Sequence, residues 1–393
     1  MKRPLRIGLV DQSAPGWSAG ATFTEMLLHS LTAACAEAGD AEVVKAPRIA
    51  PSLLPGEQVM RERLGLGDKL VPLPGETRLR RALLWLDPGD VFSWAQQNRI
   101  EVLLPLFDLP PWDPRVRTIG WIPDFQHLHQ PQFFTSAELQ RREACGRRLA
   151  QRATRIMLSS QDAAGHFAAF APAETDKVRV LPFPSLLAFS DEWGDTPTVS
   201  GQKFSLPEKF ALVANQFWAH KNHECVIAAV AQLQRQGVRI PVVMTGLPAD
   251  HRQPANDTVS RVLQTIAECG LSGQVVVLGL VTRLDLVTLM RTASVIIQPS
   301  RFEGWSTVVQ DAIALGRPLL CSALAVHREQ APSALGFFDP ATPSALAELL
   351  AQQWEGLRPG PGPEETAALE QEREAARAHG RQLLQWCREC AGR

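Results

Sequence analysis

The sequence predicts an α/β protein with two doubly wound domains, each built on a parallel sheet. The chain has 393 residues, which is enough for two domains that each bury a core. Residues 5–38 read as a strand, a glycine-bearing loop and a helix, the opening unit of a doubly wound domain. Residues 210–315 alternate between apolar β-type runs and helical stretches, which indicates a parallel sheet.

The composition is that of an ordinary globular chain and excludes several classes of protein. Charged residues make up 21% of the chain and the net charge is −1, so no basic field favours nucleic acid as a partner. The first apolar run is too short for a secretory signal, and no run reaches the ~20 residues that a transmembrane helix needs. The seven scattered cysteines suit reduced thiols, and Cys387 with Cys390 lacks the second ligand pair of a zinc site.

The first half of the chain supplies the predicted N-terminal domain, residues 1–182. After the strand at 5–10, residues 11–20 form a polar loop without a G-x-G-x-x-G or Walker A pattern, and a helix is expected at 21–38. Residues 46–80 are rich in Pro and Gly and read as a long excursion. Further strands are expected at 100–107, 118–122, 155–159 and 177–181, with a helix at 161–170. A Pro-punctuated linker is predicted at 183–208.

Polar side chains follow the predicted strand at 118–122. Asp124, His127 and His129 lie on its exit loop beside aromatic residues. Single histidines are usually structural, but two of them with an aspartate at a strand end mark a candidate site. The loop therefore has two interpretations, a functional site or a structural turn.

The second domain is expected at residues 209–355, and its first strand, at 210–214, runs into a polar segment with Lys221. A cation beside a helix N-terminus is a suitable anchor for a diphosphate, whereas the alternative is a solvated surface lysine. The remaining expected elements are strands at 240–245, 275–278 and 293–298, helices at 256–269, 282–291 and 343–355, and a polar loop at 326–330, a candidate for a further ligand edge. A long charged helix is expected at 364–391.

Residues 298–318 read as a strand end, a loop, a helix and a break. Pro299 ends the strand, Ser306 or Thr307 can cap the helix, and Thr307 with Gln310 fits a capping box. The loop carrying Glu303 therefore opens onto a helix N-terminus at the carboxyl end of a parallel strand. Open α/β sheets bind ligands there, and the free N–H groups favour an anion.

Two carboxylates, Glu303 and Asp311, belong to this corner. If the seven residues between them were helical, the rise would be ~12 Å with the side chains ~80° apart. The acid pair of a glycosidase requires roughly 5–9.5 Å. The two acids are better placed to hold two parts of an elongated ligand, such as the hexose and the ribose of a nucleotide sugar. The alternative is an ordinary capped helix.

The run Ser-Arg-Phe-Glu-Gly-Trp-Ser that ends at Ser306, followed by Asp311, resembles the Glu–seven residues–Glu signature of the retaining family 4 glycosyltransferases ("glycosyl transferases group 1"). That family has the GT-B fold, in which two Rossmann-like domains face a cleft. The resemblance implies that Glu303 contacts the donor sugar and that Asp311, in place of the usual Glu, contacts the ribose. It covers nearly all of residues 205–355 and fragments of the first half.

The loop at 123–134 also resembles the family, in its Asp-x-x-His-x-x-x-Pro-x-Phe-Phe pattern. Many members carry a histidine directly before the Asp, near the sugar being transferred. Here Pro123 takes that place, so the resemblance leaves His127 as the substitute and implies Glu303, His127 and Asp124 as catalytic residues. It implies the following donor-binding residues: Gly20 (with Ser18 and Ala19), Asn215, Lys221, Gly246, Leu280, Gly304, Trp305, Ser306, Thr307 and Asp311. The usual Arg near Asn215 is missing, so Lys221 carries more of the charge.

The expected function is that of a retaining glycosyltransferase, which moves a hexose from a GDP- or UDP-sugar to a hydroxyl of a glycan or glycolipid. No metal and no other cofactor is expected, because helix N–H groups and Lys221 can neutralise the leaving diphosphate. The alternatives are a nucleotide-sugar epimerase of GT-B fold and a non-catalytic nucleotide-sugar-binding protein. By analogy with the family, the helix at 364–391 would cross back to the first domain. The expected location is the cytoplasm, with peripheral association with the inner face of the membrane as an option.

Overall fold

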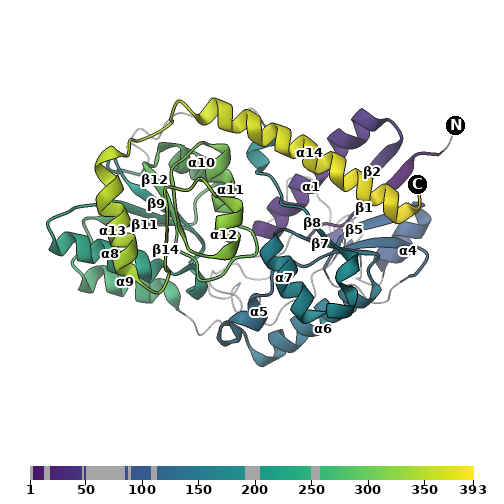
Figure 1. The fold of residues 1–393 in the computed structure, drawn as a ribbon, viewed down its shortest axis with the longest axis horizontal. Coiled ribbons are helices and arrows are strands. Elements are labelled where there is room, and N and C mark those ends of the chain that lie inside the picture. The colour runs from purple at the N-terminus through teal and green to yellow at the C-terminus, as the bar shows by residue number, and fades with distance from the viewer. Residues whose placement is uncertain are drawn as a thin grey trace. The chain divides into compact units, whose positions relative to one another are not determined.

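The structure is a computed structural model that describes residues 3–12, 18–46, 48–49, 85–86, 90–107, 113–190, 204–248 and 257–393. The chain divides into two compact units (Figure 1). Unit 1 comprises Met1–Pro184 and Glu374–Arg393, and unit 2 comprises Ser185–Arg373. Each unit contains a six-stranded sheet in which all neighbouring strands are parallel, with helices between most successive strands. The predicted α/β class with two doubly wound sheets is therefore confirmed.

Unit 1 has the strand order β2-β1-β5-β6-β7-β8. Its strands are β1 (Leu5–Leu9), β2 (Ala41–Lys45), β5 (Val102–Leu106), β6 (Arg117–Trp121), β7 (Arg155–Leu158) and β8 (Val178–Val180). Its helices are α1 (Ser18–Ala38), α4 (Asp90–Gln97), α5 (Gln126–His129), α6 (Ser136–Arg152) and α7 (Gln161–Phe170). A separate two-stranded ladder joins β3 (Arg48–Ile49) to β4 (Trp85–Leu86). Most of the excursion predicted at 46–80 lies outside the described residues.

One boundary in unit 1 differs from the prediction in a way that concerns the site. Helix α1 begins at Ser18, so Ser18, Ala19 and Gly20 form its first turn rather than the end of a loop. The carbonyl of Gly20 accepts a hydrogen bond from Thr24 Oγ1 at 3.0 Å, one helical turn further on. Glycine is typical of loops and turns because its backbone is flexible, so Gly20 led the sequence analysis to place the start of the helix after it.

The core of unit 1 includes the C-terminal helix, α14 (Glu365–Ala391), from Glu374 onward. Leu383, Leu384 and Cys387 are buried there. Gly380 permits close packing against α1, since a Cβ at this position would lie 2.2 Å from the carbonyl oxygen of Ser30. The neighbouring His379 Nδ1 lies 3.1 Å from Ser30 Oγ. The last turns of α14 are therefore part of the first unit's interior.

Unit 2 has the strand order β11-β10-β9-β12-β13-β14. Its strands are β9 (Ala211–Ala214), β10 (Val242–Thr245), β11 (Val275–Gly279), β12 (Val295–Gln298), β13 (Leu319–Ser322) and β14 (Gly336–Phe338). Its helices are α8 (His223–Arg235), α9 (Thr258–Glu268), α10 (Arg283–Thr292), α11 (Thr307–Ala314), α12 (Ala325–Gln330) and α13 (Pro343–Gln353), followed by the start of α14. The order of the strands reverses between β9 and β12, so their carboxyl ends form a topological switch point.

The polar loop predicted at 326–330 is wrong, because these residues belong to helix α12. Val326, His327 and Gln330 are buried on one side of it. Arg328 and Glu329, the two charged residues between His327 and Gln330, hide this amphipathic spacing in the sequence. Of the linker predicted at 183–208, residues 191–203 lie outside the described residues. Among the residues that are described, no helix is long and apolar enough to cross a membrane.

Candidate functional site

Two buried amides mark the switch point of unit 2. Asn215 follows β9 directly and Gln298 is the last residue of β12. The pairing of Ile296 with Leu212 places both strand ends at the same edge of the sheet. Asn215 Nδ2 donates to Gln298 Oε1 at 2.8 Å, and both side chains are nearly inaccessible to solvent. This edge is where an open α/β sheet binds its ligand.

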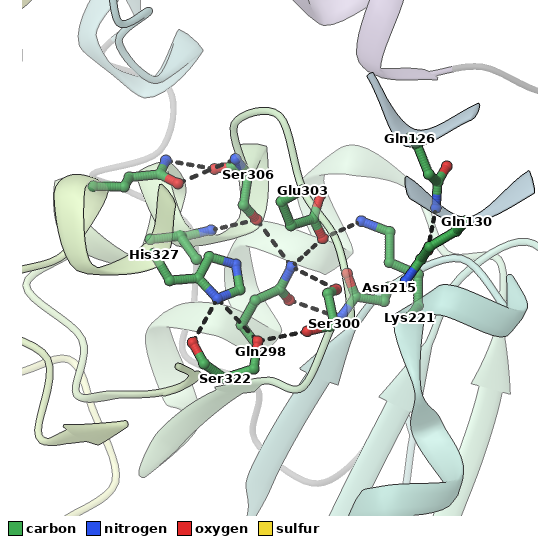
Figure 2. A network of polar contacts seen from close by, with 12 residues as sticks. Gln126, Gln130, Asn215, Lys221, Gln298, Ser300, Glu303, Ser306, Ser322 and His327 are labelled. Atoms are coloured by element: carbon green, nitrogen blue, oxygen red, sulfur yellow. Dashed lines mark hydrogen bonds and ion pairs between the residues drawn. The ribbon is translucent and has the colours of Figure 1, made fainter. Parts of the chain in front are cut away.

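An ion pair between Lys221 and Glu303 lies at this edge (Figure 2). Lys221 Nζ is 2.6 Å from Glu303 Oε1, and the side chains are 15% and 9% exposed. Lys221 ends a short 3-10 turn, and the next residue, Asn222, has a φ of 57°. Asn222 Nδ2 donates to the carbonyls of Pro299 and Pro340, which holds the turn against the loop after β12. The structure thus brings together two residues that the sequence separates by 82 positions.

The N-terminus of helix α11 is fixed by its own cap and by a glutamine from α12. Ser306 Oγ accepts from Val309 N at 3.3 Å, so Ser306 is the cap. Gln330 accepts from Ser306 N and donates to Ser306 O. The predicted capping box of Thr307 with Gln310 is wrong, because Ser306 is the cap and the Gln310 side-chain oxygen accepts from Gln330 Nε2 at 3.2 Å instead. Thr307 and Val308 lie in the first turn, where N–H groups precede the helical hydrogen-bond ladder and favour an anion.

Asp311 lies inside α11, is 4% exposed and is held by residues that the sequence did not indicate. Its Oδ1 accepts from Ser185 Oγ at 2.6 Å, and its Oδ2 is 2.6 Å from Arg283 NH1. An ionised carboxylate offers about four lone-pair positions. Asp311 therefore keeps acceptor capacity for a further hydroxyl.

His327 holds the start of the loop after β12 through hydrogen bonds that pass by way of Ser322. This side chain is completely buried, and its Nδ1 lies 3.0 Å from both the hydroxyl and the carbonyl of Ser322. Ser322 Oγ in turn donates to the carbonyl of Ser300 at 2.6 Å. Burial lowers the pKa of His327, which keeps the ring neutral. The chain from His327 through Ser322 fixes the start of the loop that carries Glu303.

The other predicted donor-binding residues of unit 2 border this edge. Gly246 follows β10, where a Cβ would lie 2.0 Å from the carbonyl oxygen of Asn215, so close backbone packing requires a glycine here. Leu280 follows β11 and is 68% exposed. Gly304 and Trp305 are half-buried in the loop that leads to α11.

The predicted catalytic residues of unit 1, Asp124 and His127, follow β6, and His127 and His129 belong to the short helix α5 rather than to the expected loop. Asp124 Oδ1 accepts from the first N–H of α5, that of Gln126, at 2.9 Å. His127 is 6% exposed, and neither of its ring nitrogens has a hydrogen-bond partner among the described residues. Burial lowers the pKa of His127, so the imidazole is neutral and can both donate and accept. The His129 ring lies 4.0 Å from the ring of His166.

Several residues of the site were missed in the sequence. These are Ser185, Arg283, Gln298, Ser300 and Ser322, whereas His327 and Gln330 lie in the segment 326–330 that was expected as a further ligand edge. The signal for Gln298 was available, because it is a polar residue at the end of the otherwise apolar β12. The partners of Asp311 gave no local signal. Within the described residues, no group of three or more His, Cys, Asp or Glu side chains is arranged to hold a metal ion.

Two wound units with a polar edge at a switch point define the class of doubly wound α/β proteins, which bind ligands at that edge. Residues 199–356, which cover most of unit 2, match the model of the family described as "Glycosyl transferases group 1". No curated protein sequence matches the chain.

Solved structures resemble the chain over almost its whole length. A glycosyltransferase from Rickettsia africae has 12% identity and a TM-score of 0.63, with 99% of each chain covered. Sucrose-phosphate synthase from Thermosynechococcus elongatus has 15% identity and a TM-score of 0.66, also with 99% of each chain covered. HepE from Anabaena, in complex with UDP-glucose, has 16% identity and a TM-score of 0.59, over 99% of this chain and 98% of that one. At such identities the likeness establishes the fold, and the chain has the GT-B fold that the sequence resemblance implied.

Proposed function

We propose that the protein is a retaining glycosyltransferase that moves a hexose from a UDP- or GDP-sugar to a hydroxyl of a glycan or glycolipid. The observation that carries this proposal is the Lys221–Glu303 pair, held beside the start of α11 at the switch point of unit 2. A cation, a helix N-terminus and an acid in one place suit a ligand that combines a diphosphate with hydroxyl groups. The family match over residues 199–356 supports the same reading.

In this proposal each part of the donor has its own partners in unit 2. The diphosphate binds Lys221 and the first N–H groups of α11. Glu303 accepts hydrogen bonds from the hexose hydroxyls. Asp311, oriented by Ser185 and Arg283, accepts from the ribose. Leu280 offers an exposed apolar surface to the base.

The proposed transfer breaks the bond between the anomeric carbon and the diphosphate oxygen. The acceptor hydroxyl attacks from the face that the diphosphate leaves, and its proton passes to a phosphate oxygen. Because Lys221 is paired with Glu303 before the donor binds, the diphosphate has to draw the ammonium toward itself. The released carboxylate is then satisfied by the hexose, so the two recognition events are coupled. We assign the acceptor side to unit 1, with Asp124 and His127 as its polar groups.

Charge relief by Lys221 and by helix N–H groups predicts that transfer does not require a metal. A panel of UDP- and GDP-hexoses is first screened by thermal shift, and turnover of the binders is followed in excess EDTA. Proton NMR of the first product reads its anomeric configuration. Retention, with full activity in EDTA, is the expected result.

Other outcomes would replace the proposal. Donor isomerisation without an acceptor would indicate an epimerase, and binding without turnover would indicate a nucleotide-sugar-binding protein. An inverted product, or activity abolished by EDTA and restored by Mg²⁺ or Mn²⁺, would overturn the proposed mechanism.

A further inference from the structure

We infer that Gln298 is a positioning residue of the proposed transferase, which fixes the Glu303 carboxylate relative to Lys221 and the start of α11. The inference rests on the proposed function, and it concerns a residue that does not itself contact the donor. Its basis is the arrangement of hydrogen bonds around one buried amide (Figure 2).

Gln298 is a buried polar residue in an apolar strand. The other residues of β12, Val295, Ile296 and Ile297, are apolar and fully buried, and Gln298 is also 0% exposed. Burying an amide is unfavourable unless it is hydrogen-bonded, so an apolar side chain here would fill the core without this requirement. The polar groups around Gln298 therefore indicate what its amide does.

The orientation of the amide is determined on both sides. Its oxygen accepts from Asn215 Nδ2 at 2.8 Å. Its nitrogen lies 2.9 Å from Glu303 Oε1, 3.0 Å from Ser306 Oγ and 3.3 Å from Ser300 Oγ. The two N–H groups serve the two nearest acceptors, Glu303 and Ser306. One side chain thus connects the end of β9, the loop of Glu303 and the cap of α11.

Glu303 Oε1 is shared between Gln298 and Lys221. When a diphosphate draws Lys221 away, the bond from Gln298 remains and keeps the carboxylate directed toward the sugar. Hydrogen bonds to a charged group are the stronger ones, and an acid held in one rotamer contributes more to a transition state than a mobile one. Gln298 therefore acts on transfer through Glu303.

The test is a double-mutant cycle between Gln298→Met and Glu303→Gln. It is measured with whichever UDP- or GDP-hexose turns over fastest. Gln298→Met is expected to lower kcat roughly tenfold or more, the loss that one hydrogen bond to a charged group accounts for. The Kd of the free nucleoside diphosphate, by calorimetry, should stay within about threefold, because Gln298 does not reach it. In the Glu303→Gln background, Gln298→Met should cost almost nothing more, because coupled residues are non-additive.

A second measurement and a control variant guard against a folding artefact. The melting temperature of Gln298→Met is recorded with its kcat, which separates a loss of fold from a loss of transfer. Gln274→Met is the matched control, since Gln274 is a buried glutamine at the amino end of β11 and donates to Ile240 O at 2.8 Å. It should lower the melting temperature without changing kcat.

Additive losses in the cycle, or an unchanged kcat in Gln298→Met, would overturn the inference and leave the proposed function standing. A parallel fall of kcat and diphosphate affinity would also overturn it, because that result indicates general damage to the site. Wild-type protein that turns over none of the UDP- or GDP-hexoses would overturn the proposed function, and the inference with it.

Discussion

The carboxyl edges of the two sheets differ in how their polar groups are satisfied. In unit 2, Asn215, Gln298, Glu303 and Lys221 are bonded to one another in a continuous network. In unit 1, His127 is equally buried, but its ring nitrogens have no hydrogen-bond partner among the described residues. A network whose hydrogen bonds are all made holds its geometry before a ligand binds. Buried polar atoms without hydrogen-bond partners lower the stability of the fold, and a ligand that bonds to them removes this destabilisation. We therefore regard these four residues of unit 2 as a preorganised edge and the surroundings of His127 as dependent on the substrate. Elsewhere in unit 2, Asn222 Oδ1 and His327 Nε2 also lack partners among the described residues.

The strongest test of the preorganised edge is to remove the charge of Glu303. Glu303→Gln should lower transfer about 100-fold or more, because a neutral amide holds the hexose hydroxyls and Lys221 less strongly. The fold should survive, since Gln fits the same space. Initial rate and melting temperature are measured together, with Glu348→Gln, an exposed residue of α13, as the control for the loss of charge. Near-wild-type turnover in Glu303→Gln would remove this residue from the site.

A second test concerns the other partner of the ion pair. Lys221→Ala should weaken binding of the free nucleoside diphosphate by ~1.5–3 kcal/mol, the value of a charge-assisted contact. Calorimetry measures this directly. Lys209→Ala serves as the control, because Lys209 packs over the Trp354 ring and should affect stability rather than affinity. Equal affinity in wild type and Lys221→Ala would show that the diphosphate binds elsewhere.

The sequence anticipated the preorganised edge well where its signals were local. Glu303, Ser306 and Lys221 were each identified from a strand end followed by a helix start. The partners that fix them come from far along the chain: Gln330 is 24 residues from Ser306, and Ser185 is 126 residues from Asp311. Such pairings depend on tertiary packing, which no window of sequence contains. The same limit explains the wrong capping box, since Gln330, 20 residues further on, donates to the Gln310 oxygen that local spacing assigned to the helix start.

A third test concerns the buried ring of His127 in unit 1, whose nitrogens have no hydrogen-bond partner among the described residues. His127→Phe replaces a buried ring without hydrogen-bond partners by an apolar ring of similar shape. The free energy of unfolding should rise by about 1 kcal/mol, because an unsatisfied polar group is removed, while transfer should fall roughly tenfold. Denaturant melts and initial rates measure the two effects. Lower stability with unchanged transfer would identify His127 as a structural residue.

The last test concerns the stability of both units and its dependence on pH. Burial lowers the pKa of His379 in unit 1 to about 3 and that of His223 in unit 2 to about 4. Below about pH 6.5 the unfolded chain binds protons that the folded histidines refuse, so stability is lost as the pH falls, by up to ~1.4 kcal/mol per pH unit and histidine. Denaturant melts from about pH 7 down to about pH 5 measure the slope. His379→Leu should reduce it, whereas His29→Gln, at an exposed site in α1, should not; an unchanged slope in His379→Leu would contradict the assignment.

The discontinuous make-up of unit 1 affects the order in which the chain can fold during synthesis. Unit 2 is contiguous, from Ser185 to Arg373, whereas unit 1 needs residues 374–393 to complete its interior. Gly380 and Leu383 join the packing around α1, which the ribosome releases more than three hundred residues earlier. The second unit can therefore finish folding first, while the first unit waits with part of its apolar surface exposed. Nascent chains are thus open to capture by chaperones at unit 1, until the last turns of α14 emerge.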